Sequence, residues 1–407
     1  MDYKVLFLIL FTLEHAYQLI LNLVQYRSAG NPTPANVADV YDAETYQKWR
    51  AYHGEKSRLT IWRTAASWVL TMALLICGFH AAAASIFPAN TFMQLLGVIL
   101  AQTLVETVVF LGFSWYDTMV IEQKYGFNNT TVKTFVIDQV RNFIIEIVIG
   151  VILMGLLAWI HKALGDWVVL LFTGVVFVFT LAISFLYGPV FSRLGNKFVP
   201  LEEGELKDKL MALLGKHGYQ VKAIEVMDAS RRTTKLNAYF TGFGKLKSIV
   251  LYDNLLTAME TDEIVAVFAH ELGHGLHKDV LKQQIMNLGN LLIMSLLVWV
   301  TVREPAMHQA FGFTQVNYGF AFVLLGGLLG LIQPLTGMAM SAYSRHAEYR
   351  ADAQAVKEGY GEALVGGLKK LARENFANLA PSRALVVLEY SHPPLSERIA
   401  AIEKKAA

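Results

Sequence analysis

Residues 168–190 read VVLLFTGVVFVFTLAISFLYGPV, an apolar stretch that contains no charged side chain. A helix rises about 1.5 Å per residue, so a helix of this length would cross the roughly 30 Å hydrocarbon core of a membrane. A helix that is apolar on every side is either buried in a large core or exposed to lipid. This stretch therefore predicts a transmembrane helix.

The composition of the whole chain supports the same interpretation. Of 407 residues, 54% are hydrophobic and 17% are charged, whereas a soluble domain carries about 25% charged residues. The mean hydropathy is +0.40. The formal net charge of +2 excludes a strongly basic nucleic-acid binder, and the single cysteine, Cys77, excludes an intramolecular disulfide framework and a cysteine-based zinc cluster. We expect a mainly α, polytopic membrane protein.

Seven apolar runs are long enough to be transmembrane helices. They are 4–24, 64–86, 93–115, 135–159, 168–190, 285–302 and 319–341. The first run lacks a basic segment before it and carries Glu14 and His15 in its middle, so we expect a retained helix rather than a cleaved signal peptide.

The distribution of Lys and Arg between the loops predicts the orientation. The loops after spans one and five are rich in both residues and the loop after span three carries Lys124 and Lys133, whereas the alternate loops carry few. The N-terminus is therefore expected outside or in a lumen, with residues 191–284 and the C-terminus in the cytoplasm. The compartment stays open between a bacterial inner membrane and the endoplasmic reticulum, since an ending with Lys404 and Lys405 is weak evidence for retrieval to the latter.

These spans divide the chain into four parts. Residues 1–190 hold five spans, and residues 285–341 hold spans six and seven. Residues 191–284 form an α+β segment, in which 202–216 has helical spacing, 219–227 resembles a strand, and 237–252 resembles two strands around Gly242-Phe243-Gly244. Residues 342–407 are helical, interrupted at His392-Pro393-Pro394.

Some polar side chains fall within the predicted spans, among them Gln102, Glu106, Asp138 and Glu146. Such groups are costly when they face lipid, so we expect them to face the bundle interior, a partner or water. A hydrated cavity and ordinary hydrogen bonding between helices explain them equally well.

The sequence His270-Glu271-Leu272-Gly273-His274 carries the clearest chemical signal. On a helix, His270 and His274 project from one face and can bind one Zn²⁺, while Glu271 is placed to accept a proton from a water molecule at the open position. The alternative is a solvated helix face with two histidines and a glutamate. That alternative must place three costly polar groups directly after the apolar run 264–268.

Zinc needs a third protein ligand, and the extended pattern that would supply a histidine at 280 is absent because position 280 is Val280. The best candidate is Glu348. It shares a helix face with Asp352, which would accept the second N–H of a ligand histidine. His346 is the competing ligand, and a solvated acidic face is the alternative for Glu348 and Asp352 together.

These motifs together resemble the type I CAAX prenyl endopeptidases, integral-membrane zinc metalloproteases with seven spans. The resemblance runs from about Tyr46 to Arg398 and also rests on Glu122-Gln123-Lys124-Tyr125-Gly126-Phe127-Asn128, Asn237-Ala238-Tyr239-Phe240 and Ser391-His392-Pro393-Pro394-Leu395-Ser396-Glu397-Arg398. It implies seven transmembrane helices that enclose a hydrated cavity, capped by a cytoplasmic α+β zinc metalloprotease domain.

The resemblance also implies roles for individual residues. Glu348 would be the third zinc ligand and Glu271 the general base, and His392 would lie near the substrate carbonyl. His392 or Arg398 could donate to the developing oxyanion. Asn237 and Ala238 would lie on the strand that binds the peptide. A turn histidine and an ordinary hairpin strand are the alternatives for His392 and for residues 237–240.

The sequence therefore favours a membrane zinc endopeptidase that removes the C-terminal tripeptide of prenylated CAAX-type substrates, with one Zn²⁺ per chain. The expected partners are a prenylated or membrane-associated substrate and the lipid bilayer, not nucleic acid; the sequence does not indicate an oligomeric state. One alternative is a quality-control protease for membrane proteins with the same mechanism. Another is a transporter or channel with a structural zinc site, which would have no need of Glu271.

Overall fold

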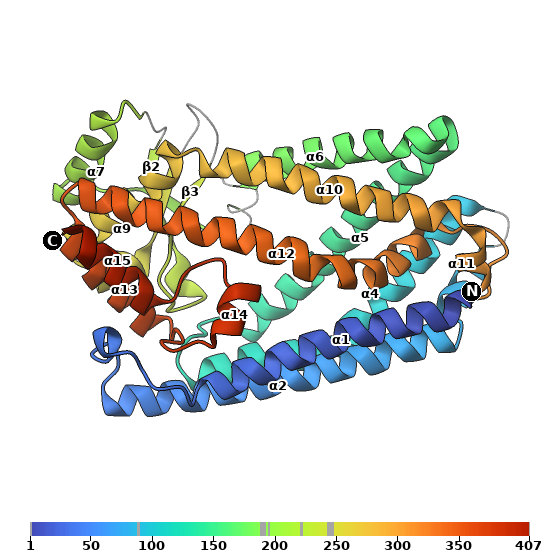
Figure 1. Ribbon diagram of the computed structural model, residues 1–407, viewed down its shortest axis with the longest axis horizontal. Coiled ribbons are helices and arrows are strands. Elements are labelled where there is room, and N and C mark those ends of the chain that lie inside the picture. The colour runs from blue at the N-terminus through green and yellow to red at the C-terminus, as the bar shows by residue number, and fades with distance from the viewer. Residues whose placement is uncertain are drawn as a thin grey trace.

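The computed structural model describes residues 2–87, 90–187, 193, 196–219, 223–241 and 248–406, and most of them are helical (Figure 1). The long helices are α1 (Tyr3–Ser28), α2 (Ala43–Ile76), α4 (Thr91–Trp115), α5 (Val132–Leu164), α6 (Val168–Tyr187), α10 (Asp279–Arg303) and α12 (Tyr318–Lys357). Short elements between them are η1 (Ala35–Val37), α3 (Phe79–Ser85), η2 (Tyr116–Glu122), η3 (Gly165–Trp167) and α11 (Pro305–Gln309).

Six helical segments of the described chain are long and apolar enough to cross a membrane. Each of the seven predicted runs overlaps one of these segments, and Val132–Ser184 overlaps two of the runs because it covers α5 and most of α6. The run predicted at 64–86 is not one helix: α2 ends at Ile76, and Gly78 adopts a left-handed φ of 71° before α3 begins. A second difference is that residues 43–63, expected as a basic loop, form the first half of α2, which Asp42 caps at its N-terminus.

The described residues outside the candidate membrane spans, here called the soluble part, contain a four-stranded sheet in the order β1-β2-β4-β3. Its strands are β1 (Phe198–Pro200), β2 (Ala223–Met227), β3 (Ala238–Thr241) and β4 (Ser248–Tyr252). Strands β2 and β4 are parallel and the other two pairs are antiparallel, which leaves β3 at an edge. The predicted strand at 219–227 is confirmed from residue 223 onward, and the predicted turn Gly242-Phe243-Gly244 lies outside the described residues.

Helices α7 (Glu205–Lys216), α8 (Asp253–Ala258) and α9 (Thr261–Leu276) complete the α+β segment, with the short turn η5 (Ala229–Arg231) before β3. The inner faces of the sheet, α7 and α9 share one hydrophobic core, to which α9 contributes Ile264, Val265 and Phe268. The C-terminal helices are α13 (Gly361–Glu374), α14 (Arg383–Leu388) and α15 (Leu395–Ala406). Leu364 of α13 and Ile402 of α15 close the same core from the other side.

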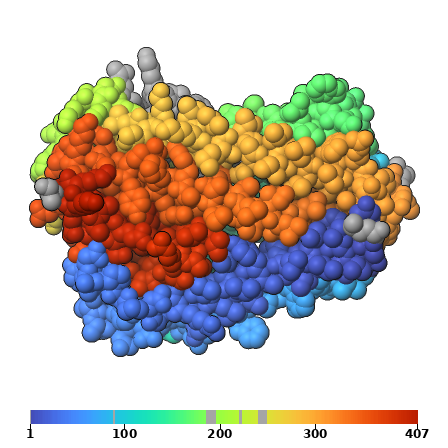
Figure 2. All heavy atoms as spheres, in the orientation of Figure 1, coloured from blue at the N-terminus to red at the C-terminus, as the bar shows by residue number. Residues whose placement is uncertain are grey.

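The N-terminal helices also hold the C-terminal helices in place, and Figure 2 shows the C-terminal segment (red) against the N-terminal helices (blue) on this face. The hydroxyl of Tyr41 donates to the carbonyls of Ala372 and Ala377, at 3.0 and 2.8 Å. Trp49 donates to the carbonyl of Phe376, and Asn36 donates to that of Ser396. The soluble part is therefore built from segments far apart in sequence.

Polar groups within the predicted spans bond across helices. His80 of α3 bonds to Gln102 of α4 at 2.7 Å, and Gln102 donates to Glu106. Asp138 of α5 pairs with Arg232 of the soluble segment at 2.5 Å. These contacts confirm that Gln102, Glu106 and Asp138 have partners.

Helices α9 and α12 are in close contact at Gly273. A Cβ added there would lie 2.9 Å from the Cα of Ala351 and 3.0 Å from the Cβ of Gln354, both on α12. Gly215 of α7 is a matched control, because a Cβ at that helical position meets nothing within 4 Å.

We predict that Gly273→Ala separates α9 from α12 and destabilises the protein by about 1–3 kcal/mol, as overpacked contacts do. Gly215→Ala should be neutral or stabilising by up to about 1 kcal/mol, since alanine favours helix. Thermal unfolding of the two variants in detergent measures the difference. Equal unfolding temperatures would show that α9 and α12 tolerate a wider separation.

Candidate metal site

Helix α9 presents the two motif histidines on its face toward α12. The helix begins with a capping box, in which the side chains of Glu260 and Glu263 each accept from the other's backbone N–H. The carboxylates of Asp262 and Glu263 in the first turn interact favourably with the helix dipole. Its next residues, Ile264 to Ala266, are buried, which fixes the helix against the sheet. The rings of His270 and His274 lie one turn apart, with 4.9 Å between their centroids.

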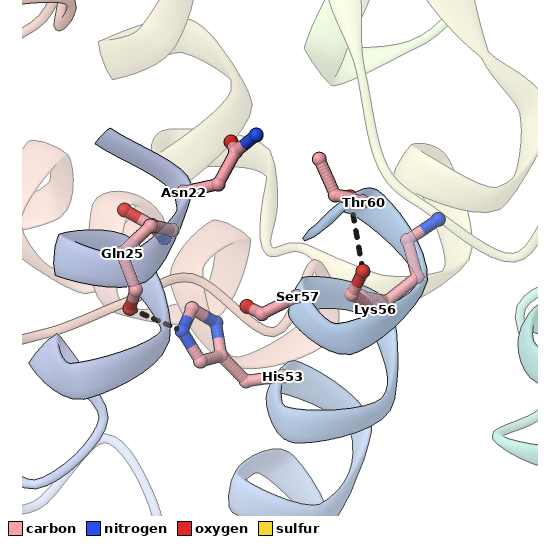
Figure 3. Close-up of a pocket in the computed structure, with 6 residues that line it drawn as sticks. All are labelled: Asn22, Gln25, His53, Lys56, Ser57 and Thr60. Carbon is pink, nitrogen blue, oxygen red and sulfur yellow. Dashed lines mark hydrogen bonds between the residues drawn. The ribbon is translucent and has the colours of Figure 1, made fainter. Parts of the chain in front are cut away.

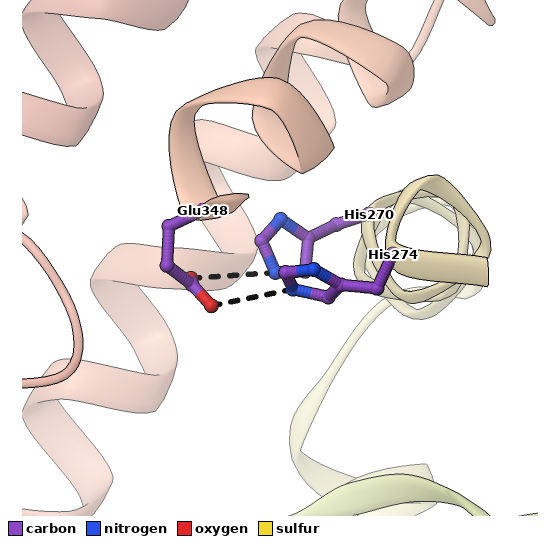
Figure 4. Close-up of side chains that lie close together, drawn as sticks. All are labelled: His270, His274 and Glu348. Atoms are coloured by element: carbon purple, nitrogen blue, oxygen red, sulfur yellow. Dashed lines mark ion pairs between the residues drawn. The ribbon is translucent and has the colours of Figure 1, made fainter. Parts of the chain in front are cut away.

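Glu348 of α12 reaches both histidines (Figure 4). Its Oε1 lies 3.2 Å from Nε2 of His274, and its Oε2 lies 3.5 Å from Nε2 of His270. One possible ligand atom from each of the three side chains lies within 4.8 Å of the other two. The three residues predicted from sequence as metal ligands are thus brought together, whereas the competing candidate, His346, is exposed to solvent.

Asp352 lies one turn beyond Glu348 and binds the far side of His270. Its Oδ1 is 2.8 Å from Nδ1 of that histidine, which leaves Nε2 directed at Glu348. The guanidinium of Arg398 donates to both oxygens of Asp352, at 2.9 and 2.6 Å, and its Nη1 lies 3.3 Å from Glu348. Arg398 is itself buried, so its charge is held by these two carboxylates rather than by water.

Asp279 is the partner of the second histidine, and sequence reasoning missed it. Its Oδ2 lies 3.1 Å from Nδ1 of His274, while its Oδ1 accepts from Tyr343 at 2.9 Å and Arg350 at 2.6 Å. Asp279 is the first residue of α10, directly after Lys278, whose φ is 55°. The only signal in the sequence is an acid five residues after His274, and its meaning depends on that sharp turn.

His392 and Glu271 lie beside this cluster. Nε2 of His392 is 3.4 Å from Glu348, and Nδ1 bonds to the hydroxyl of Ser391 at 2.9 Å. The side chain of His392 is 63% exposed, so it stands at the solvent side of the cluster. Glu271 is half-buried on α9 between the two histidines in sequence.

Asn237 and Ala238 lie at the start of the edge strand β3. Tyr252 of β4 donates its N–H to the carbonyl of Asn237 at 3.1 Å. Because hydrogen-bonded and non-bonded pairs alternate in an antiparallel ladder, the N–H and C=O of Ala238 point away from β4. That N–H bonds instead to the side chain of Asn237 at 2.9 Å.

Neighbouring carboxylates change the protonation of His274. Burial would lower the pKa of His274, but hydrogen bonds to Glu348 and Asp279 and the charge of Glu271 outweigh it and raise that pKa to about 9. Without a metal ion, His274 therefore carries a proton at neutral pH.

The donor set fits a divalent cation. Two imidazole nitrogens and one carboxylate make the three-ligand set of an open metal site. Within the described residues, Oε2 of Glu348 is buried and accepts no hydrogen bond. The four carboxylates of Glu271, Asp279, Glu348 and Asp352 exceed the two guanidinium groups of Arg350 and Arg398 by two charges, which one divalent cation would balance.

The sequence matches two family models that together span most of the chain. Residues 22–197 match the model described as "CAAX prenyl protease N-terminal, five membrane helices". Residues 200–406 match the model of peptidase family M48. The two matches meet at β1, where the soluble segment begins.

Full-length relatives and a solved structure agree with these matches. The chain is 30% identical to the CAAX prenyl protease 1 homolog of Oryza sativa, over 96% of this chain and 95% of that protein. It is 31% identical to CAAX prenyl protease 1 of Saccharomyces cerevisiae, over 96% and 93%. The crystal structure of S. mikatae Ste24p superposes with a TM-score of 0.92 and 27% identity, over 99% of each chain.

Loss of a residue that only orients a metal ligand typically lowers metal affinity ~10–100-fold. We predict that Glu348→Ala lowers metal affinity by more than this, because the substitution removes a ligand itself. His346→Ala is the matched control, since His346 is exposed on the same helix two residues earlier. Elemental analysis of the purified variants measures bound metal per chain. If His346→Ala lost metal while Glu348→Ala kept full occupancy, His346 and not Glu348 would be the third ligand.

We further predict that metal binding releases about one proton at pH 7. The pKa of about 9 means that His274 is protonated there, and a metal ligand must be neutral. Apparent affinity should therefore rise as the pH increases from 7 to 9, and proton release should fall to about half at the pKa of about 9 and decrease further above it. Calorimetric titration in two buffers of different ionisation enthalpy measures the released proton, and pH-independent release would contradict the assignment.

Proposed function

We propose that this chain, which belongs to the CAAX prenyl proteases of peptidase family M48, is a zinc endopeptidase that removes the C-terminal tripeptide of prenylated CAAX-type substrates. The observation that carries the proposal is the convergence of His270, His274 and Glu348, with Glu271 on the same helix. The relatives are named as CAAX prenyl proteases, which supports the substrate class.

In this proposal His270, His274 and Glu348 hold one zinc ion. Imidazole and carboxylate are ligands that zinc accepts in sites that keep an open position. A zinc ion there would supply Lewis-acid activation of water and of the scissile carbonyl. Asp352 and Asp279 fix the orientation of the two imidazoles, because each accepts from the ring nitrogen that faces away from Glu348.

Glu271 is the proposed general base. It adjoins His270 on α9 and is half-buried, so its carboxylate is both near the cluster and accessible to water. His392 is the proposed donor to the oxyanion of the substrate, since its ring stands at the exposed side of Glu348. The contacts of Arg398 support a different role, which is to hold Asp352 and Glu348 in place.

The substrate peptide is proposed to add to the edge strand β3. Ala238 presents a backbone N–H and C=O away from β4, the arrangement that an added strand requires. Asn237 occupies the N–H of Ala238 with its side chain. In the proposed complex, the substrate carbonyl would take the place of that side chain.

We assign seven membrane crossings by treating α5 and α6 as separate spans. Their combined segment of 53 residues would be about 80 Å long as one helix, far more than a bilayer needs. Gly165, with a φ of 58°, is the turn between them. The excess of Lys and Arg in alternate loops supports a cytoplasmic position for 191–284 and 342–407, which together form the catalytic unit around the cavity that the helices would enclose.

The mechanism predicts that Glu271→Gln retains metal and fold but loses cleavage by at least about 100-fold in kcat, the usual contribution of a general base. A farnesylated CAAX peptide and its unlipidated twin are the substrates, with peptide products quantified by mass spectrometry. Wild-type protein should cleave the farnesylated peptide preferentially, because its lipid holds it at the membrane.

Each outcome separates the alternatives. Equal rates on the two peptides would favour a protease for membrane proteins in general. Metal binding without cleavage of either peptide would favour a transporter or channel with a structural site. Cleavage by Glu271→Gln at the wild-type rate would show that Glu271 is not the base.

A further inference from the structure

The sequence Glu122-Gln123-Lys124-Tyr125-Gly126-Phe127-Asn128 has no part in the metal site. It begins at Glu122, the last residue of η2, a π-helical segment that continues α4. Asp117 and Glu122 both contact the ammonium of Lys56 on α2, at 2.5 and 2.9 Å. In an α-helix, residues five apart point about 140° away from each other, whereas a π-helix hydrogen-bonds residues five apart and aligns them. The π-helical segment is therefore what directs both carboxylates at Lys56.

A second lysine, from the soluble segment, reaches the same acid. The ammonium of Lys235 lies 3.2 Å from Oε2 of Glu122 and 3.2 Å from the hydroxyl of Tyr52. It also stands over the ring of Phe127, 4.8 Å from the centroid. We call Lys56, Asp117, Glu122 and Lys235 the charge cluster. It balances two lysines with two acids and joins membrane helices α2 and α4 to the soluble part.

The charge cluster shares Lys56 with a neighbouring polar pocket between α1 and α2. That pocket has a volume of about 180 Å³ and is lined by Asn22, Gln25, His53, Lys56, Ser57 and Thr60. Figure 3 shows the Lys56 side chain extending away from Gln25 and His53. The ammonium of Lys56 is thus committed to Asp117 and Glu122 rather than to the pocket.

Backbone bonds run alongside the charge cluster. Asn128 forms a bridge with Thr233, Thr234 donates to the carbonyl of Phe127 at 3.3 Å, and Asn129 donates to that of Arg232 at 3.0 Å. The loop after η2 therefore pairs with residues 232–234 as a short strand would.

The next residues are held from the other side. The side chain of Asn375, just after α13, accepts from the N–H of Leu236 at 2.9 Å and donates to its carbonyl at 3.1 Å. Asn254 donates to the carbonyl of Lys235 at 2.9 Å. The chain from 232 to 236 is fixed at every residue, and the edge strand begins two residues later, at Ala238.

We propose that Lys235, held by Glu122, is a positioning residue that fixes the start of β3 relative to the membrane helices. It thereby sets the register in which an extended substrate pairs with Ala238. This inference rests on the proposed function, in which β3 binds the peptide. The physical reason is the period of a strand: a slip of one residue turns every side chain to the opposite face and displaces the scissile bond. Lys235 makes no contact with His270, His274 or Glu348 among the described residues, so it acts on the substrate strand and not on the metal.

The test compares Lys235→Met and Lys235→Arg in the full-length, metal-loaded protein, with the farnesylated peptide as substrate. Lys235→Met should raise KM about tenfold, within the loss that a 1 Å misplacement produces. It should also yield a second product displaced by one residue, with metal content unchanged. Lys235→Arg keeps the charge and should restore the wild-type KM and single product.

Lys209→Met is the matched control. It removes a lysine of the same soluble segment that pairs with Glu205 and Asp262, at 2.6 and 2.7 Å, away from β3. It should leave KM and the product unchanged. A wild-type KM and single product in Lys235→Met would overturn the proposal, as would loss of metal in that variant, which would make Lys235 a general structural residue.

Hydrogen exchange provides a measurement that does not require catalytic activity and uses Lys235→Gln in place of Lys235→Met. Amides of residues 234–241 should exchange faster in Lys235→Gln than in the wild type or in Lys209→Gln. Unchanged exchange would overturn the inference. If wild-type protein cleaves neither peptide, the proposed function fails, while the exchange measurement still decides whether Lys235 fixes the edge strand.

Discussion

The close contact between α9 and α12 at Gly273 is the constraint on which the metal site depends. Ala351 and Ala355 of α12 are fully buried, so small side chains on both helices let the backbones approach. That approach places Glu348 within reach of two histidines fixed about 75 residues earlier. Because α12 is also a candidate membrane span, the membrane part and the metal site share one helix of 40 residues.

The residues around the three ligands make this arrangement depend on the whole chain. Arg398 comes from the last helix, and Asp279 comes from the first turn of α10. Each supports a different histidine, the former through Asp352 and the latter directly. An ion pair this deeply buried costs much desolvation unless every charge has a partner. The C-terminal helix therefore contributes to the metal site through electrostatics as well as through packing.

The features predicted from the sequence are those that local spacing determines. Apolar runs gave the membrane helices, and the spacing of four residues in His270–His274 and Glu348–Asp352 placed each pair on one helix face. The break at Gly78, the helical start of α2 and the role of Asp279 were missed. Each depends on tertiary contacts or on a left-handed residue, which residue spacing does not reveal. Arg398 was recognised as important, but its bond to Asp352 was not.

Charge balance connects the metal site to its protonation. Asp279, Glu348 and Asp352 are each at most 4% exposed, while only two guanidinium groups oppose them and Glu271. In the metal-free protein, the neighbouring carboxylates raise the pKa of His274 to about 9, and the proton that His274 then holds at neutral pH supplies part of the missing charge. A divalent cation must displace that proton, and it brings two charges in place of one. The same carboxylates therefore attract both the proton and the metal ion. Metal binding is stronger at alkaline pH, because the imidazole of His274 is then already neutral.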